Sequence, residues 1–186
     1  MKHAHSRRFD LPFRWPPKPF HVVLVEPQIP PNTGNIARLC AATGSLLHLI
    51  EPLGFPITDS KLKRAGLDYW HSIDIRRHKT FDDFLRAVAP PRLFLFSTRG
   101  KRAYTSVRYE AGDALVFGSE SKGLPDALLD AYPENVLGIP IRTEHVRSLN
   151  LSSAAAVALY EALRQVHESH AGSRGGKSGF PSPGSG

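Results

Sequence analysis

Runs of β-branched and other apolar residues alternate with helix-like segments along most of this chain. The runs that favour strands cover residues 20–26, 46–51, 92–98, 114–119 and 135–141. Helical spacing or helix-capping residues mark the segments 32–43, 59–67, 80–88, 125–132 and 149–167. Such alternation is typical of a mostly parallel, buried sheet flanked by helices. The sequence therefore predicts an α/β fold, with Asn32 as the cap of the helix over 32–43.

The length of 186 residues predicts one folded unit, at about 20–168, with an extension at each end. Residues 1–19 are rich in Pro and Arg and show no period, which predicts a flexible basic arm. Residues 169–186 are rich in Gly and Ser and are expected to form a disordered tail. The net charge of +7 lies mostly in these ends, so it gives only weak support for a polyanionic partner.

Several classes of protein are excluded by what the sequence lacks. A single cysteine, Cys40, cannot form an intrachain disulfide, and it is expected to be a buried thiol in a protein of the reducing cytoplasm. Prolines interrupt the basic N-terminal segment, which therefore differs from a signal peptide. His167 and His170 have no acidic or cysteine partners nearby in the sequence. We expect neither a membrane nor a metal ion as a partner.

The candidate sites lie where predicted strands end, because parallel α/β sheets bind ligands beyond the carboxyl ends of their strands. The first is residues 27–38, where a proline-rich loop leads into a helix that carries Asn32, Asn35 and Arg38. Free N–H groups at such a helix start can bind an anion, and an arginine one turn later adds a fork of donors. An ordinary asparagine cap is the alternative interpretation.

The second candidate is residues 117–125, which follow another predicted strand. Gly118 and Gly123 allow the backbone to approach a ligand closely, and Glu120 places a carboxylate between them. A phosphate loop would need Lys followed by Ser or Thr after the last glycine, and Leu-Pro stands there instead. A glycine turn capped by Glu120 is the alternative.

The third candidate is residues 142–153, where Ser148 or Asn150 is placed to cap the last helix. The small side chains that follow predict a tight helix crossing or a contact between subunits. Three basic clusters beside aromatic residues would also suit RNA binding, although solvated surface is the usual explanation for such clusters. They cover residues 61–64, 76–79 and 99–102.

Taken in order, the three candidates resemble the motifs of the SPOUT (SpoU-type) RNA 2′-O-methyltransferases. The motifs read Asn32-Thr-Gly-Asn35-Ile-Ala-Arg38, then Phe117-Gly118-Ser-Glu120-Ser-Lys-Gly123-Leu-Pro125, then Ile139-Pro-Ile and Ser148-Leu-Asn150-Leu-Ser-Ser. The resemblance covers about 20–168. The compact length and residues 26–35 and 63–69 are similar to the TrmL branch, whose members methylate the wobble cytidine or uridine, nucleotide 34, of tRNA.

The resemblance implies a C-terminal trefoil knot, a homodimer and tRNA as substrate. It implies S-adenosylmethionine as the methyl donor and S-adenosylhomocysteine as the product. Cofactor-binding roles are implied for Phe96, Gly118, Ile139 and Ser148, and catalytic roles for Arg38, Asn35, Glu120 and Asn150. Because an arginine stays protonated, we expect Arg38 to grip a phosphate and stabilise the developing alkoxide rather than to act as a base.

Two other functions stay open at this point. The same chemistry could act on another tRNA position or on ribosomal RNA, since motifs that build a cofactor pocket do not specify the RNA site. A dimeric RNA-binding protein without activity is the second possibility, although intact motif residues argue against it. The basic arm is expected to raise tRNA affinity through salt-dependent phosphate contacts.

Overall fold

The computed structural model describes residues 11–56, 74–142 and 144–172. Its strands are β1 (His21–Val25), β2 (Leu46–Ile50), β3 (Ile75–His78), β4 (Leu93–Phe96), β5 (Arg102–Ala103), β6 (Ala114–Phe117) and β7 (Val136–Gly138). Its α-helices are α1 (Pro30–Thr43), α3 (Phe81–Val88), α4 (Asp126–Ala131) and α5 (Leu151–Gly172). Single 3₁₀ turns cover Tyr104–Ser106 and Pro133–Asn135.

All strands belong to one sheet in the order β3-β2-β1-β6-β4-β7-β5, and every neighbouring pair is parallel. The predicted α/β fold is therefore confirmed. The chain leaves β1 toward β2 on one side, while β6 pairs with β1 on the other. Ligands of open parallel sheets bind outside the carboxyl ends of strands at such a change of direction, so the order of the strands points to one edge of the sheet.

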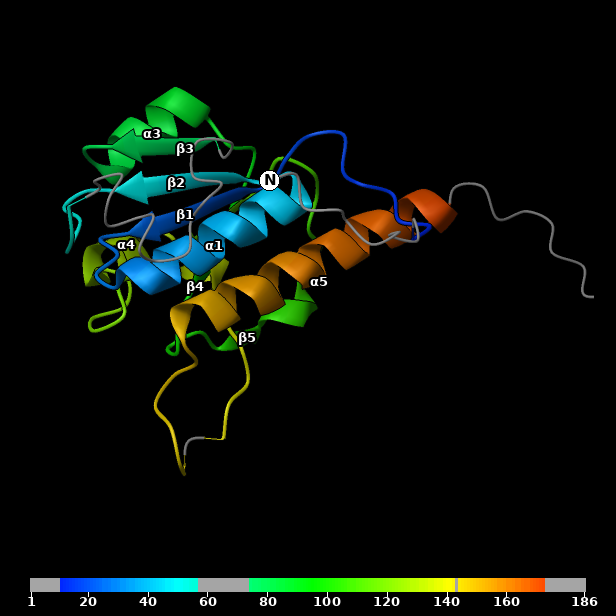
Figure 1. Cartoon of the computed structure of the whole chain (residues 1–186). Coiled ribbons are helices and arrows are strands. Elements are labelled where there is room, and N and C mark those ends of the chain that lie inside the picture. The colour runs from blue at the N-terminus through cyan, green and yellow to red at the C-terminus, as the bar shows by residue number, and fades with distance from the viewer. Residues whose placement is uncertain (1–10, 57–73, 143, 173–186) are drawn as a thin grey trace, which may run out of the picture.

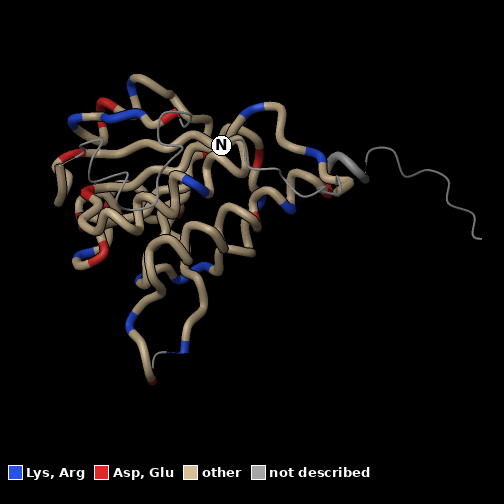
Figure 2. Tube along the Cα trace, viewed as in Figure 1, with Lys and Arg blue, Asp and Glu red and all other residues tan. Residues whose placement is uncertain are grey.

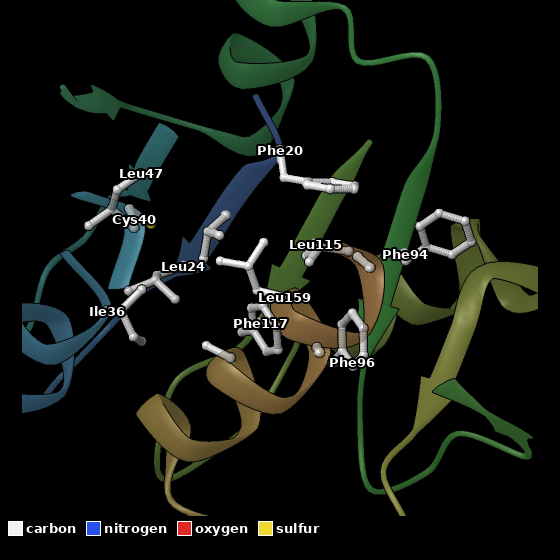
Figure 3. Packing of buried hydrophobic residues seen from close by; sticks show 14 of the residues in the cluster. Phe20, Leu24, Ile36, Cys40, Leu47, Phe94, Phe96, Leu115, Phe117 and Leu159 are labelled. Carbon is white, nitrogen blue, oxygen red and sulfur yellow. The ribbon is translucent and has the colours of Figure 1, made fainter. Parts of the chain in front are cut away.

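Both faces of the sheet are buried under helices. Side chains alternate between faces along each strand, so Leu24 and Phe117 lie on the face covered by α1 and α5, together with Ile36 and Leu159 (Figures 1 and 3). The opposite face carries a second apolar cluster that includes residues of α3 and α4. Burial on both faces explains why the central strands are continuous apolar runs.

Helix α1 begins two residues earlier than predicted, and the expectation that Asn32 caps it is wrong. The N-cap is Ile29, and prolines occupy the first helical positions. A proline is suited to this place because its missing N–H would have no partner in the first turn. Asn32 is therefore inside the helix, with its side chain available for other contacts. Thr80 caps α3 and forms a reciprocal capping box with Asp83.

Other element boundaries also differ from the sequence prediction. The strand β3 was not predicted, because its sequence IRRH is polar and partly exposed at the edge of the sheet. The segment predicted as a strand over 135–141 is a strand only at Val136–Gly138. The last helix, predicted to end at 167, continues to Gly172. The predicted helix over 59–67 and the basic cluster at 61–64 lie outside the described residues.

Three histidines from neighbouring strands form a hydrogen-bonded row on the α3 face. His48 is fully buried and its ring nitrogens lie 3.0 Å from Nδ1 of His21 and 3.0 Å from Nε2 of His78. The ring of Phe84 from α3 packs against His48 at 5.0 Å between centroids. Burial, followed by the two neighbouring imidazoles, lowers the pKa of His48 to about 3. Burial also lowers the pKa values of His21 and His78, so the row is neutral at physiological pH.

Cys40 lies in the core, as predicted, and burial raises the pKa of its thiol to about 12. Such a thiol is inert because its reactive thiolate form is absent at neutral pH. None of the helices in the described part of the chain combines the length and the hydropathy that a bilayer crossing needs.

Candidate active site

A cavity of about 780 Å³ opens where β4, β6 and β7 end and where α5 begins. Its position at the carboxyl edge of the sheet agrees with the rule for parallel sheets. The residues predicted to hold the cofactor all line this cavity: Phe96, Gly118, Ile139 and Ser148. Glu120 and Asn150 line it as well. Four separate segments thus converge on one volume of the size that binds small molecules and cofactors.

One wall of the cavity is the loop that follows β6. Its backbone folds back on itself, with Ser119 N–H donating to the Gly123 carbonyl at 3.1 Å and Gly123 N–H donating to the Ser119 carbonyl at 2.8 Å. A Cβ atom at Gly118 would lie only 1.9 Å from the carbonyl carbon of Gly123. Glycine is therefore required at this position, because any side chain would push the two halves of the loop apart.

Glu120 connects this loop to the start of α1. Its carboxylate accepts hydrogen bonds from the backbone N–H groups of Gln28 at 2.8 Å and Ile29 at 3.1 Å, and from the Asn32 side-chain amide at 3.0 Å. N–H groups before a first helical turn have no partner within the helix, and the helix dipole favours a negative charge there. Glu120 therefore fixes where α1 begins.

Asn32 then connects α1 to α5. Its Oδ1 accepts a hydrogen bond of 2.9 Å from Nδ2 of Asn150. Asn150 in turn accepts at Oδ1 from the N–H of Ser152 at 2.9 Å and from the Ser152 hydroxyl at 2.7 Å, which caps the start of α5. Asn150 thus caps α5, as expected, and it also lines the candidate site. The three motif segments are joined through one buried amide.

Asn32 is the site residue that sequence reasoning misplaced. Its burial and its two amide contacts come from residues far along the chain, which no local pattern reports. The signal that could have found it is the Pro-Pro pair at 30–31, which favours a helix start before residue 32. An asparagine inside the first turn must find partners other than its own helix.

Arg38 and Asn35 do not line the cavity. Both are exposed on α1 and border a separate shallow groove of about 360 Å³ between α1 and α5. Ser152 and Ser153 form the facing side of this groove, with small or apolar side chains completing it. The structure therefore brings together six of the eight predicted site residues and leaves these two on the neighbouring surface.

Basic side chains outnumber acidic ones in the lining of the cavity. Lys122 and Arg147 belong to its lining, and Arg99 lies there in an ion pair with Asp126. Figure 2 shows basic residues in blue on both arms of the long loop that precedes α5, where the sequence has Arg142 and Arg147. Such a rim attracts a polyanion. Within residues 11–56, 74–142 and 144–172, no three His, Cys, Asp or Glu side chains are grouped as a metal site would require.

Comparison with known proteins identifies the family. The model of the SpoU rRNA Methylase family matches residues 19–160 of this chain. The chain belongs to the SpoU methylase family. A tRNA (cytidine(34)-2′-O)-methyltransferase from Burkholderia pseudomallei is 53% identical over 150 residues, which are 79% of this chain and 96% of that SpoU relative.

Solved structures of SpoU proteins share the fold. One was solved in work on the 2-OH methylation of C/U34 on tRNA. It has a TM-score of 0.73 and 50% identity, and the match covers 80% of this chain and 97% of the solved chain. Another is the SpoU methyltransferase AviRb from Streptomyces viridochromogenes in complex with AdoMet. It has a TM-score of 0.68 and 25% identity, covering 83% of this chain and 59% of that one.

Proposed function

We propose that this protein is a tRNA (cytidine(34)/uridine(34)-2′-O)-methyltransferase that uses S-adenosylmethionine. The observation that carries the proposal is the 53% identity to a cytidine-34 enzyme along 96% of that enzyme's length. A match over nearly the whole length of that enzyme supports the same substrate as well as the same chemistry. We place the protein in the cytoplasm, together with its tRNA.

The cavity is suited to S-adenosylmethionine. Its volume of about 780 Å³ is large enough for a nucleoside with an amino-acid chain, and its walls combine apolar groups with exposed backbone. Phe96 and Ile139 would contact the flat, apolar part of the cofactor, and the backbone at Gly118 would approach it closely. Ser148 would donate a hydrogen bond at the far wall. When bound, the cofactor supplies an electrophilic methyl group on a positively charged sulfur.

The protein has two tasks in the transfer of this methyl group to the 2′-oxygen. It must hold the ribose in line with the methyl group, and it must stabilise the oxygen as the hydroxyl proton passes to water and the neutral thioether leaves. Arg38 suits the second task, because a guanidinium stays protonated and can bind a phosphate through two parallel hydrogen bonds. Asn35 lies one turn earlier on α1 and would contact the ribose.

Glu120 and Asn150 are positioning residues in this proposal. Their side chains are occupied by the hydrogen bonds to the start of α1, to Asn32 and to Ser152. Through these bonds they set the axis of α1, and α1 carries Asn35 and Arg38. A change at Glu120 would therefore lower turnover by moving Arg38.

We also propose that the enzyme is a homodimer that pairs through α1 and α5. On α5, Ser153, Ala156, Val157 and Tyr160 follow the spacing of one helix face. The side chains of Val157 and Tyr160 are 38% and 52% exposed. A second copy packed there would border the groove that contains Arg38. The trefoil knot, supported by the similarity to SpoU structures, stays a prediction.

The test is methylation of unmodified tRNA by the purified protein with S-adenosylmethionine, followed by mass spectrometry of nuclease fragments. One added ribose methyl on nucleotide 34 is the expected result. A methyl on another tRNA nucleotide, or on ribosomal RNA, would contradict the wobble assignment while keeping the chemistry. Binding of S-adenosylmethionine without any methylated RNA would favour the inactive RNA-binding protein.

The role of Arg38 is tested by Arg38→Lys. The lysine keeps the charge but loses the planar fork, so we expect turnover to fall by about 100-fold, the order of one lost donor to a developing oxyanion. The dissociation constant of S-adenosylmethionine should stay unchanged, because Arg38 is outside the cavity. Arg86→Gln, on the far side of the sheet, is the matched control. Undiminished turnover of Arg38→Lys would remove Arg38 from the catalytic machinery.

A further inference from the structure

Residues on both sides of the segment that matches the family model meet at the far end of α5. The family model matches residues 19–160, whereas Phe13 precedes this segment and His167 follows it. Their rings stack with centroids 4.7 Å apart and planes 12° from parallel. The backbone N–H of Arg14 donates to Nδ1 of His167 at 3.1 Å. The part of the N-terminal arm around Phe13 and Arg14 is thus fastened to the C-terminal part of α5 (Figure 1).

This attachment holds a tryptophan at the surface. Trp15 packs edge-on against Phe13, with ring centroids 4.7 Å apart and planes at 62°, and its side chain is 52% exposed. Phe13 itself packs against the main core cluster. The position of Trp15 is therefore fixed by the fold, while much of its ring stays accessible. A fixed, accessible aromatic ring is suited to stacking on an unpaired base.

Basic side chains flank the tryptophan. Arg14 and Lys18 are exposed, and Arg108 is exposed beside α5, where Tyr109 N–H donates to Gln165. The acidic residues of this part of α5, Glu161 and Glu168, are both ion-paired with Arg164. Arg164 therefore balances one of these two negative charges, whereas Arg14, Lys18 and Arg108 add three positive charges, so positive charge is in excess around this part of α5; Figure 2 draws Lys and Arg residues in blue.

We propose that Phe13, Arg14, Trp15, Lys18 and His167 form an arm platform that binds the tRNA away from its reacting nucleotide. The proposal rests on the proposed function. At 1.5 Å per residue, the 16 residues from Leu151 at the cavity to His167 span about 24 Å. A ligand that occupies both places must be long and polyanionic, which describes a folded RNA. Phosphates would contact Arg14 and Lys18, and a base or sugar edge would contact Trp15.

A contact so far from the reacting ribose adds the same binding energy to the ground state and to the transition state. It therefore lowers KM and leaves kcat unchanged. For Trp15→Ala and for the double variant Arg14→Gln/Lys18→Gln, we expect Kd and KM for tRNA to rise about 3- to 10-fold. Their kcat and their affinity for S-adenosylmethionine should match the wild type. Trp15→Phe should retain most of the affinity, because phenylalanine still stacks.

Salt dependence separates phosphate contacts from structural effects. Each lost phosphate contact reduces the slope of log affinity against log salt by about 0.7 to 0.9, the range from single strands to B-DNA, so the double variant should lose about 1.4 to 1.8. Arg86→Gln, which removes an exposed arginine from α3, should keep the wild-type slope. In a Trp70→Phe background, Trp15 is the sole tryptophan, and its fluorescence should be quenched by tRNA.

The inference is overturned if Trp15→Ala and the double variant bind tRNA within twofold of the wild type with the same salt slope. It is also overturned if these variants lose kcat without a change in KM, or if they dissociate the dimer, since the platform would then support the site or a second copy. Binding is measured without methylation. If the wild type methylates nucleotide 34 and the variants bind tRNA as the wild type does, only the platform is rejected. If the wild type binds tRNA without methylating it and the variants bind more weakly, only the proposed reaction is rejected.

Discussion

At the scale of single residues, Asn32 and His48 show two ways in which a buried polar side chain is satisfied. Asn32 bonds to Glu120 and Asn150, each from a distant part of the chain, and so joins the parts of the candidate site. His48 bonds to two other histidines and so joins neighbouring strands. A buried polar group without partners would be destabilising. Both residues therefore depend on the whole sheet being formed.

The first prediction concerns pH. The pKa of His48 in the folded protein, about 3, lies below its ordinary value of 6.5, so the unfolded chain takes up the proton first as pH falls. The contribution of His48 to the free energy of unfolding is fully present above about pH 6.5 and is lost as pH falls toward 3. Urea unfolding at pH 7, 6 and 5 should show this loss. In His48→Leu, the slope of the free energy of unfolding against pH should be smaller by up to about 1.4 kcal/mol per pH unit.

His145→Gln is the control for this prediction, because it removes an exposed histidine from a loop. It should follow the wild-type pH profile. An unchanged slope in His48→Leu would mean that the acid sensitivity comes from other groups.

At the scale of elements, the sequence predicts what local patterns encode. The runs that contain β1, β2, β4 and β6 are apolar on both faces, and their positions are predicted correctly. The edge strand β3 was missed because only one side of it is paired and its side chains are polar. The two-residue strand β5 has too few residues for any pattern, and it exists because β7 lies beside it.

The second prediction concerns the loop after β6. Gly118→Ala places a methyl group 1.9 Å from the Gly123 carbonyl carbon, so the loop must open and S-adenosylmethionine binding should be lost. Calorimetric titration would measure the binding. Gly44→Asn is the matched control: Gly44 lies outside the cavity lining, it has φ +67° and open space around it, and asparagine tolerates this conformation. Tight binding by Gly118→Ala would show that the loop adapts and does not need glycine.

At the scale of the whole molecule, the proposed dimer predicts the third result. Tyr160→Glu adds a charge to the exposed face of α5 and should shift the protein from dimer to monomer in sedimentation experiments. Methylation should fall with the dimer fraction. Ala87→Glu, on an exposed position of α3 on the opposite side of the sheet, should stay dimeric. A wild type that sediments as a monomer at working concentration would contradict the proposed assembly.

The whole-molecule arrangement is the part that local patterns cannot predict. The motif positions Phe96, Gly118, Ile139 and Ser148 were assigned through family resemblance, and the structure places them around one cavity. The same reasoning grouped Arg38 and Asn35 with them, although these two face a different groove. The spacing of residues along a helix does not show which cavity or groove each of them will face. The order of the strands is likewise set by pairings between segments that are distant in the sequence.

The hydrogen bonds of Asn32 have a consequence for the protein while it is being made. Its partners Glu120 and Asn150 lie 88 and 118 residues later in the chain. A ribosome adds about 5 to 20 residues per second, so β1, α1 and β2 leave it several seconds before Asn150 is added. A nascent chain or a prematurely released fragment cannot close the cavity around the methyl donor. The chain must therefore extend at least to Asn150 before it can complete the candidate cavity for S-adenosylmethionine.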